Sequence, residues 1–308
     1  MTSDTATVTA VIVTYQSRPT IAYALDGLKA AYDAGVAKCV VVDNQSADGT
    51  ADFVAEAYPW VELVRSPKNI GFGRGCNLGF ERVTTPYVLF LNPDASVDLD
   101  ALHKMTAFMD AHPNAAISGP ATQSPDGGWV WSGKLLTPLG LVRSALHGGA
   151  RALQHRAIEP GSAAVPTEWV CGAIMLVRSE MFRALDGFDP RFFLYYEETD
   201  LCLRALRAGW ENWAIGEAVG KHIGRVSSKQ AGSERGVGRN GDIAEYFYPS
   251  QFYYLAKNFG WFSAVSAEIA TETIEWLRWL RRTRFGTAAR GPKTKTSRYF
   301  FRMPAKPG

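Results

Sequence analysis

The chain has 308 residues, 46% apolar and 20% charged, with 33 basic and 30 acidic side chains. These values are ordinary for a globular protein, and they exclude a disordered, collagen-like or low-complexity chain. A formal net charge of +3 is too small for a protein built around nucleic acid, so no nucleic-acid partner is expected.

The cysteines and the N-terminus indicate a compartment. The four cysteines are far apart and form no CxxC pair, which favours a reducing compartment over a zinc knuckle or a disulfide framework. Residues 1–7 carry no basic side chain before the apolar run at 8–13, which is not typical of a signal peptide. No run approaches the ~20 apolar residues of a spanning helix. We expect a cytoplasmic protein, free or peripheral at the inner face of the plasma membrane.

Short apolar runs alternate with helical patterns in the first half of the chain. The runs that predict strands are 8–13, 38–42, 61–65, 87–91 and 115–119, and the patterns that predict helices are 20–32, 48–57, 71–82 and 100–111. This alternation predicts an α/β fold with a mostly parallel central sheet and helices on both faces. Ligands of such sheets bind beyond the carboxyl ends of the strands, so the residues after each run carry the most information.

Short polar side chains follow four of these strands. In chain order they are Thr14 and Tyr15, then Asp43 and Asn44, then Asn69, then Asn92 and Asp94. Any one of them alone would be explained as a helix cap or a turn former. Because they stand at successive strand ends, we interpret them as one polar crevice.

The ordered series of motifs over residues 8–222 resembles the family-2 inverting glycosyltransferases, which have the GT-A nucleotide-diphospho-sugar fold. The matching segments are VIVTY at 11–15, VVDNQSADGT at 41–50, NIGFG at 69–73, Asn77, LNPD at 91–94, GFD at 187–189 and FLYYEETDL at 193–201. The branch that this chain looks most like contains rhamnosyltransferases of bacterial polysaccharide and cell-wall linker synthesis, which often use dTDP-rhamnose.

The resemblance implies a nucleotide site at the strand ends. Asp43 would accept a hydrogen bond from the ring NH of uracil or thymine, since a carboxylate is the stronger acceptor. Thr14 and Tyr15 would pack around the base and ribose. Asn69 and two glycines would shape a tight loop near the nucleotide. The resemblance also assigns nucleotide binding to Asn44, Gly71, Gly73, Asn77 and Asn92.

The resemblance also implies a divalent cation, Mg²⁺ or Mn²⁺. Asn92-Pro93-Asp94 occupies the place of the family's DxD motif, with Asp94 as the direct ligand and Asn92 on ribose or a metal-bound water. His222, which follows a second apolar segment, would complete the metal or diphosphate site. Such a cation binds the diphosphate oxygens and stabilises the leaving group.

An acidic pair at the start of a predicted helix supplies the general base in this family. Matched residue by residue, the base is Glu198, and Glu197 is the second choice. Adjacent carboxylates repel each other, which raises one pKa, although acidic residues also suit a first helical turn for dipole reasons alone. Asp200 and Arg204, four residues apart, are interpreted as a supporting helix pair.

The middle of the chain is less regular. Residues 123–162 predict a loop-rich lid with one short helix, and 168–177 predict a strand that returns to the sheet. The small residues 171–173 within it fit either tight strand–helix packing or close approach to a substrate. The tract 227–241, near the basic Arg225, fits either a loop that folds over the diphosphate or a solvated linker.

The expected domain order is a GT-A catalytic domain at 1–225, with a nucleotide-sugar half at 8–122 and an acceptor half at 123–225. A helical extension at 226–290 and a disordered basic tail at 291–308 would follow.

Residues 260–286 predict one long helix with apolar side chains at three- and four-residue spacing. Its first half favours packing on the catalytic domain or contact in a homodimer. Its basic end favours weak contact with anionic lipid head groups, which would suit a polyprenyl-linked acceptor.

The function implied by the resemblance is a single inverting displacement. A sugar, L-rhamnose from dTDP-rhamnose in our first interpretation, would move from a nucleotide-diphospho-sugar donor to a glycan or polyprenyl-linked acceptor. The alternatives are a UDP-hexose or galactofuranose-type transferase of the same family and a non-catalytic protein that binds sugar nucleotides. A nucleotidyltransferase is disfavoured because residues 14–17 lack the glycine- and arginine-rich signature of those enzymes.

Overall fold

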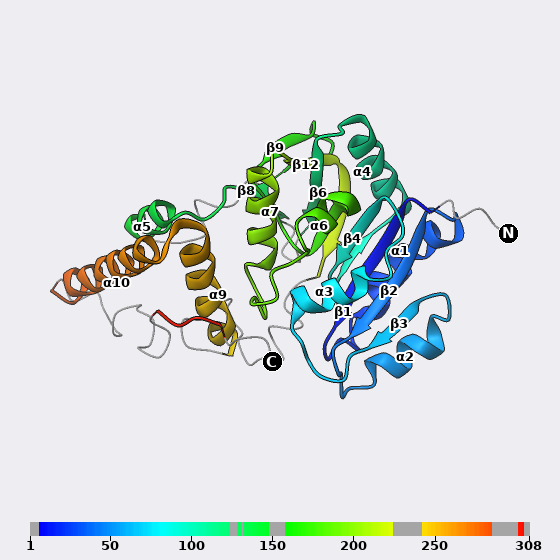
Figure 1. The fold of residues 1–308 in the computed structure, drawn as a ribbon, viewed down its shortest axis with the longest axis horizontal. Helices are drawn as coiled ribbons and strands as arrows, with labels where there is room; N and C mark the ends of the chain where they lie inside the picture. The colour runs from blue at the N-terminus through cyan, green and yellow to red at the C-terminus, as the bar shows by residue number, and fades with distance from the viewer. Residues whose placement is uncertain are drawn as a thin grey trace.

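A ten-stranded mixed sheet forms the centre of the computed structural model, which describes residues 6–123, 128–130, 132–147, 158–223, 242–284 and 301–304 (Figure 1). Its strand order is β3-β2-β1-β4-β11-β6-β12-β5, with β7 beside β6 and β9 beside β12, and β8 and β10 form a separate pair. The strands are β1 (Val8–Thr14), β2 (Ala37–Asp43), β3 (Glu62–Arg65), β4 (Tyr87–Leu91), β5 (Ala95–Val97), β6 (Ala115–Gln123), β7 (Trp129–Val130), β8 (Ser132–Gly133), β9 (Val165–Thr167), β10 (Trp169–Val170), β11 (Ile174–Arg178) and β12 (Glu211–His222).

The described helices flank this sheet and extend from it at the C-terminal end (Figure 1). They are α1 (Ile21–Asp33), α2 (Thr50–Ala57), α3 (Phe72–Phe80), α4 (Leu99–Ala111), α5 (Pro138–Leu146), α6 (Ser179–Ala184), α7 (Glu197–Arg207), α9 (Asp242–Phe259) and α10 (Trp261–Arg284). No helix in the described part of the chain is long and apolar enough to cross a membrane.

The predicted α/β fold is confirmed. Strands β1 to β4 are mutually parallel, while β11 runs antiparallel between β4 and β6 and β5 runs antiparallel to β12. Alternate residues of β1 enter different cores: Val11 and Val13 pack with α3, α6 and α7, and Ala10 and Ile12 pack with α1 and α4. This period of two is what a strand buried on both faces requires.

The single strand expected at 168–177 is wrong: the chain forms β10 and β11, separated by Cys171, Gly172 and Ala173. At this break the Asn92 backbone N–H donates to the Ala173 carbonyl at 2.9 Å, so the chain satisfies its polar groups outside the regular ladder. The break sets three small residues beside the end of β4.

One short helix was expected in 123–162, and α5 is that helix. The Thr137 hydroxyl caps it by accepting from the Gly140 N–H at 3.0 Å, and Pro138 occupies its first position. The tract 227–241 and Arg225 lie outside the described residues, so the basic-loop hypothesis stays a prediction.

The C-terminal extension contains two helices. The helix expected at 260–286 is α10, and α9 precedes it without having been predicted as a separate element. Pro249 lies inside α9, and because proline usually ends helices, the sequence does not predict a continuous helix there. Residues 301–304 belong to the tail expected to be disordered, yet the Phe301 ring lies 5.9 Å from that of Phe252. The domain boundaries themselves remain predictions.

Candidate functional site

The carboxyl ends of β1 and β2 hold a fixed carboxylate. The parallel register pairs Thr14 with Asp43, and the Thr14 hydroxyl donates to Asp43 Oδ1 at 3.0 Å. The Ser46 backbone N–H donates to Asp43 Oδ2 at 2.9 Å. Asp43 is buried, whereas the neighbouring Tyr15 is 51% exposed. An oriented acceptor beside an accessible aromatic ring is an arrangement suited to a flat base.

The loop before α3 is held in one shape by two asparagines. Asn69 Oδ1 accepts from the Gly71 N–H at 3.0 Å, and Asn44 Nδ2 donates to the Gly71 carbonyl at 3.0 Å. Gly71 has φ 86° and ψ 174°, a region open essentially to glycine. A Cβ there would lie 2.3 Å from the Phe193 carbonyl oxygen, so only glycine lets the loop approach the 193 turn this closely.

Three residues assigned to the nucleotide from the sequence make contacts within the protein. Asn77 Nδ2 donates to the Phe188 carbonyl at 2.8 Å, and Asn77 Oδ1 accepts from the Phe188 N–H at 2.9 Å. Asn44 is buried, and a Cβ on Gly73 would touch Phe188 and Glu197. These contacts position the loop and the 187–189 turn, and the assignment of Asn44, Gly73 and Asn77 to the nucleotide stays a prediction.

The pairing of β5 with β12 brings Asp94 and His222 together. His222 lies opposite Ala95 in the ladder, and the Ile223 N–H donates to the Asp94 carbonyl at 2.8 Å. As a result His222 Nε2 lies 3.1 Å from Asp94 Oδ1. The sequence placed these two side chains in one site although they are 128 residues apart, and the structure joins them.

The Asp94–His222 pair has the chemistry of a divalent-cation site with few protein ligands. A carboxylate oxygen and an imidazole nitrogen are both ligands that Mn²⁺ accepts. No cluster of three or more His, Cys, Asp or Glu side chains able to hold a metal occurs among the described residues. A cation here would therefore take its remaining ligands from a substrate or water, as phosphate-bound Mg²⁺ does.

A strained turn precedes the acidic pair at the start of α7. Tyr195 and Tyr196 have φ of 71° and 69°, the left-handed region that bulky residues rarely enter. Side chains of α9 hold the turn: Ser250 Oγ donates to the Leu194 carbonyl at 2.9 Å, and Gln251 Nε2 donates to the Tyr196 hydroxyl at 2.7 Å. Strain that tertiary contacts maintain is common at functional sites.

Glu197 and Glu198 occupy different environments. Glu197 is 4% exposed, packs against Gly73 of α3, and its Oε2 has no hydrogen-bond partner within the described structure. Burial, and then the charge of Glu198, raise the pKa of Glu197 well above its usual value. Glu198 packs against Gly172 and accepts from the Thr199 hydroxyl at 3.3 Å. Burial also raises the pKa of Glu198.

The break between β10 and β11 links the two ends of the site. Burial raises the pKa of Cys171 to about 11, and the negative charges of Glu198 and Asp94 both act in the same direction. The adjacent Gly172 would place a Cβ 3.3 Å from Glu198 Cγ. The Asn92 N–H, two residues before Asp94, donates to the Ala173 carbonyl, and Glu198 packs against Gly172, so Asp94 and Glu198 stand on either side of a common segment. The small residues at 171–173 permit this approach.

Behind the acidic pair, a buried charge network supports α7. Asp200 is fully buried and accepts from Arg204 Nε at 2.7 Å, which confirms the predicted helix pair. It also accepts from Lys257 Nζ at 2.8 Å and from Asn258 Nδ2 at 2.9 Å. Arg204 donates further to backbone carbonyls of the 185–187 turn. This network fixes the helix that carries Glu197 and Glu198.

Lys257 extends the network to Asp189, which was matched as a motif residue but given no role from the sequence. Lys257 Nζ donates to Asp189 Oδ2 at 2.8 Å, as does the Tyr253 hydroxyl. Burial alone would raise the pKa of Asp189, but hydrogen bonds from Lys257, the Arg191 N–H and Tyr253 lower it to about 2. No local signal in the sequence marks Lys257 or Gln251, because both act from α9 across long chain separations.

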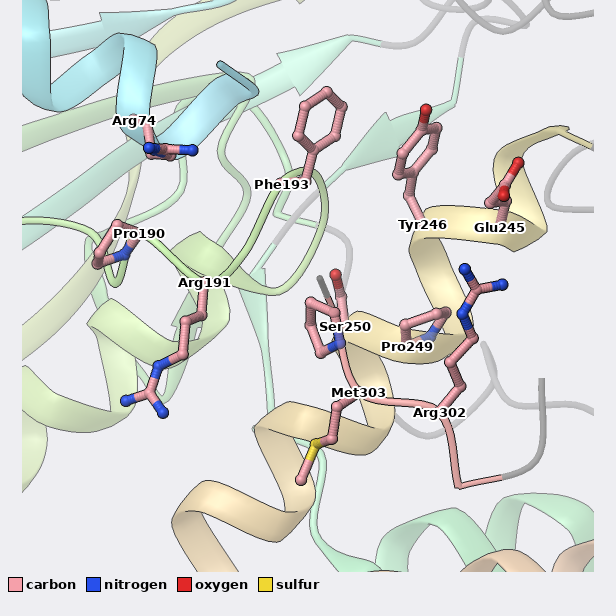
Figure 2. A pocket seen from close by; sticks show the side chains of 11 residues that line it. Arg74, Pro190, Arg191, Phe193, Glu245, Tyr246, Pro249, Ser250, Arg302 and Met303 are labelled. Atoms are coloured by element: carbon pink, nitrogen blue, oxygen red, sulfur yellow. The ribbon is translucent and has the colours of Figure 1, made fainter. Parts of the chain in front are cut away.

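A pocket of about 200 Å³ lies on the outer side of the 190–193 turn, between α3, α9 and residues 301–304 (Figure 2). Arg74, Arg191 and Arg302 line it, together with Glu245. The Phe193 and Tyr246 rings stack beside it, with centroids 4.9 Å apart and an interplanar angle of 22°. The pocket is thus bordered by cationic and aromatic side chains next to the turn that leads into α7.

Comparison with known proteins identifies a family. The family model described as "Glycosyl transferase family 2" matches residues 9–178, more than half of the chain. An N-acetylglucosaminyl-diphospho-decaprenol L-rhamnosyltransferase of Mycobacterium tuberculosis is 28% identical over 221 residues, which cover 65% of this chain and 70% of that protein.

Solved structures show the same fold at low identity. The S. aureus TarS 1–349 structure superposes with a TM-score of 0.53 at 16% identity, covering 92% of this chain and 93% of TarS. The Pyrobaculum calidifontis mannosyltransferase PcManGT, solved with GDP-Man and Mn²⁺, gives a TM-score of 0.51 at 17% identity, covering 91% and 79%. Both are glycosyltransferase structures, and the GT-A fold expected from the sequence is confirmed.

Proposed function

The chain belongs to glycosyl transferase family 2 and is a glycosyltransferase, and from that premise we propose that it transfers L-rhamnose from dTDP-rhamnose, with inversion, to a hydroxyl of a lipid-linked glycan acceptor. The observation that carries the proposal is the convergence of Asp94 and Glu198 on the segment 171–173. One carboxylate would serve the departing diphosphate and the other the incoming hydroxyl, which is what a single displacement requires.

At the donor end, Asp43 accepts from the ring NH of thymine, and Tyr15 covers the base. Support for this comes from the two hydrogen bonds that hold the Asp43 carboxylate and from the exposure of Tyr15. Thr14 orients Asp43, and the loop of Asn69 and Gly71 borders the nucleotide. Asn92, at the end of β4, contacts ribose or a water of the cation.

Asp94 and His222 would hold the divalent cation, Mg²⁺ or Mn²⁺. When bound, such a cation neutralises diphosphate oxygens and stabilises the nucleoside diphosphate as it leaves. The supporting observation is the 3.1 Å separation of a carboxylate oxygen and an imidazole nitrogen at the edge of the sheet. Among the described residues no third His, Cys, Asp or Glu completes this site, so we expect the cation and the donor to bind together.

Glu198 acts as the general base. Its neighbour Glu197 is enclosed against α3, whereas Glu198 faces the 171–173 segment that Asp94 also borders. A raised pKa strengthens a carboxylate as a proton acceptor and suits this task. Glu198 takes the proton of the acceptor hydroxyl as that oxygen attacks the anomeric carbon from the face opposite the diphosphate. No covalent intermediate is needed.

The acceptor that fits best carries a phosphate or diphosphate next to its sugar. The pocket lined by Arg74, Arg191 and Arg302 supports this assignment, because guanidinium groups are matched to phosphate oxygens. The named activity of the M. tuberculosis relative, whose acceptor is a diphospho-decaprenol, is consistent with it. The pocket volume of about 200 Å³ is many times the ~15 Å³ that one water requires, which leaves room for one such group.

The proposal is tested by thermal unfolding with sugar nucleotides and Mn²⁺. We expect dTDP-rhamnose with Mn²⁺ to raise the unfolding temperature and GDP-mannose to leave it unchanged, because we assign the site of Asp43 and Tyr15 to a pyrimidine base. In the Asp94→Asn variant the Mn²⁺-dependent part of the shift should disappear, while Asp100→Asn, on the surface of α4, should behave as wild type.

The alternatives predict other outcomes. A larger shift with UDP-hexoses than with dTDP-rhamnose would favour a UDP-hexose or galactofuranose-type transferase of the same family. Stabilisation by GDP-mannose alone would overturn the base assignment. Donor binding with no transfer to any lipid-linked acceptor would favour a non-catalytic binding protein.

A further inference from the structure

Helix α10 turns an apolar face to solvent. Phe262, Ile269 and Trp276 follow one another at intervals of seven residues, so they share one side of the helix. Their exposed fractions are 81%, 53% and 49%. Trp261 and Leu277 are also about half exposed. Of the apolar side chains in the first half, Ala264 and Ala267 are buried in the main core as expected, whereas Phe262 and Ile269 are not. Contact in a homodimer stays a prediction.

The opposite side of α10 makes the contacts with the rest of the protein. Ala264, Ala267 and Glu268 are buried, and α10 packs on α5 and α9. Arg278 donates to the Leu146 carbonyl at the end of α5. The orientation of α10 is thus fixed by small and polar side chains, which leaves the apolar face outward. Figure 1 shows α10 reaching away from the sheet, with α5 alongside.

The charge at the end of α10 is positive. Arg281 is exposed in its last turn, and the sequence there also contains Arg282 and Arg284. In the sequence, no Asp or Glu occurs after Glu275, whereas ten Lys and Arg residues do. An exposed stripe of Trp, Phe and Ile that continues into a run of cationic side chains is the pattern of a helix that lies in a membrane interface.

We propose that α10 docks this protein on an anionic membrane surface, with Phe262, Ile269 and Trp276 inserted at the boundary of head groups and acyl chains. The positive charge at the end of α10 favours an anionic membrane over a second copy of the chain as the partner of this face. In a two-fold dimer through the same face, parallel helices would set the two basic ends against each other. Antiparallel helices would set each basic end against the first turn of α10, which has no acidic side chain. Anionic lipids, in contrast, neutralise the basic end. The inference does not depend on the donor or on the acceptor.

Cosedimentation of the full chain with lipid vesicles tests the proposal. We expect binding to vesicles of phosphatidylcholine with phosphatidylglycerol, and at least about tenfold weaker binding to phosphatidylcholine alone. The double variant Phe262→Gln, Ile269→Gln should weaken binding to the anionic vesicles by at least about tenfold, because two apolar side chains no longer leave water. Tyr32→Gln, an exposed aromatic of α1, is the matched control and should bind normally.

A charge-reversal pair isolates the electrostatic part. Arg281→Glu with Arg284→Glu should abolish the preference for anionic vesicles, while Lys29→Glu with Lys104→Glu, which changes the net charge equally on α1 and α4, should not. Lys29, Lys104 and Arg281 are exposed, and circular dichroism checks that the variants fold. Equal binding to both vesicle types would overturn the proposal, as would failure to bind either. If the protein is a dimer in solution and the double variant Phe262→Gln, Ile269→Gln is a monomer, the apolar face is a dimer interface and the proposal is wrong.

Discussion

At the scale of single residues, the two adjacent glutamates show how a helix start separates two environments. Consecutive helical positions differ by about 100°, so Glu197 points into the packing against α3 and Glu198 toward the 171–173 segment. Both pKa values are raised, but Glu197 is the more enclosed. The sequence indicated both glutamates as candidates for the general base, and the burial of Glu197 favours Glu198.

The pKa of Glu197 predicts a pH dependence of stability. Since its pKa is raised in the folded state, wild type should lose stability as the pH rises from the unfolded-state pKa near 4.5 toward the folded-state value. Glu197→Gln removes this titration and should be stabilised relative to wild type at pH 7.5 but not at pH 4. Urea unfolding at both pH values measures the difference. A variant that is equally destabilised at both pH values would show that the pKa of Glu197 is not raised by folding.

Gly71 predicts a second residue-scale effect. Gly71→Ala forces a Cβ onto the Phe193 carbonyl and should destabilise the fold by about 2–4 kcal/mol and weaken donor binding. Gly49→Ala is the matched control, since Gly49 also has a positive φ but open space around it, and should cost only about 1 kcal/mol. Urea unfolding and donor titration measure both. Similar costs at the two glycines would contradict the tight approach at Gly71.

At the scale of elements, α9 connects the C-terminal extension to the catalytic helix. Lys257 binds both Asp189 and Asp200, and Ser250 and Gln251 hold the strained turn before α7. A helix distant in sequence thereby fixes the position of Glu198. We infer that the extension is part of the catalytic unit.

Removing the bridge should therefore be costly. Lys257→Met leaves the buried Asp200 and the partly buried Asp189 each short of a hydrogen bond and should destabilise the protein by about 1–3 kcal/mol. Lys29→Met removes an exposed pair with Asp33 on α1 and should cost less than about 0.5 kcal/mol. Chemical denaturation of the two variants gives the comparison, and equal costs would show that the Lys257 network contributes no more than a surface ion pair.

The same elements show what the sequence could predict. Strands buried on both faces appear in the sequence as apolar runs, so β1 to β4 were located within one or two residues. The order of the motifs singled out Asp94, His222 and Glu198 as candidates, and the structure brings Asp94 and His222 within 3.1 Å of each other. The break at 171–173 was missed because it depends on a hydrogen bond from Asn92 in another strand. The inward roles of Asn77 and Asn44 were missed because a polar side chain looks alike in sequence whether it binds a ligand or backbone. Helix α9 was hidden by Pro249.

At the scale of the whole molecule, we connect both the arginine-lined pocket and the apolar face of α10 with access to the acceptor. The pocket would receive an anionic group beside the acceptor sugar, and α10 would bring the enzyme to the surface where a lipid-linked acceptor resides. Apart from Arg74 of the pocket, these features lie outside the expected nucleotide half, which accords with a donor site on the parallel strands and an acceptor site built largely by later segments.

The pocket predicts a separation of kinetic constants. Arg191→Gln combined with Arg302→Gln should raise the KM for a diphospho-lipid acceptor by about tenfold or more, with the KM for the donor unchanged, because the lost contacts are to phosphate. Arg82→Gln, a surface arginine paired with Glu62, serves as control. Steady-state kinetics with each substrate varied in turn provides the readout. An increase in the donor KM alone would show that the pocket binds the donor and not the acceptor.

The most direct test of the account is transfer by Glu198→Gln at saturating dTDP-rhamnose, Mn²⁺ and diphospho-lipid acceptor. We predict that calorimetry finds donor affinity within about threefold of wild type while kcat falls by at least about a hundredfold. Glu197→Gln should retain most of its kcat. Near-normal turnover by Glu198→Gln, together with loss of turnover by Glu197→Gln, would contradict the assignment of the base.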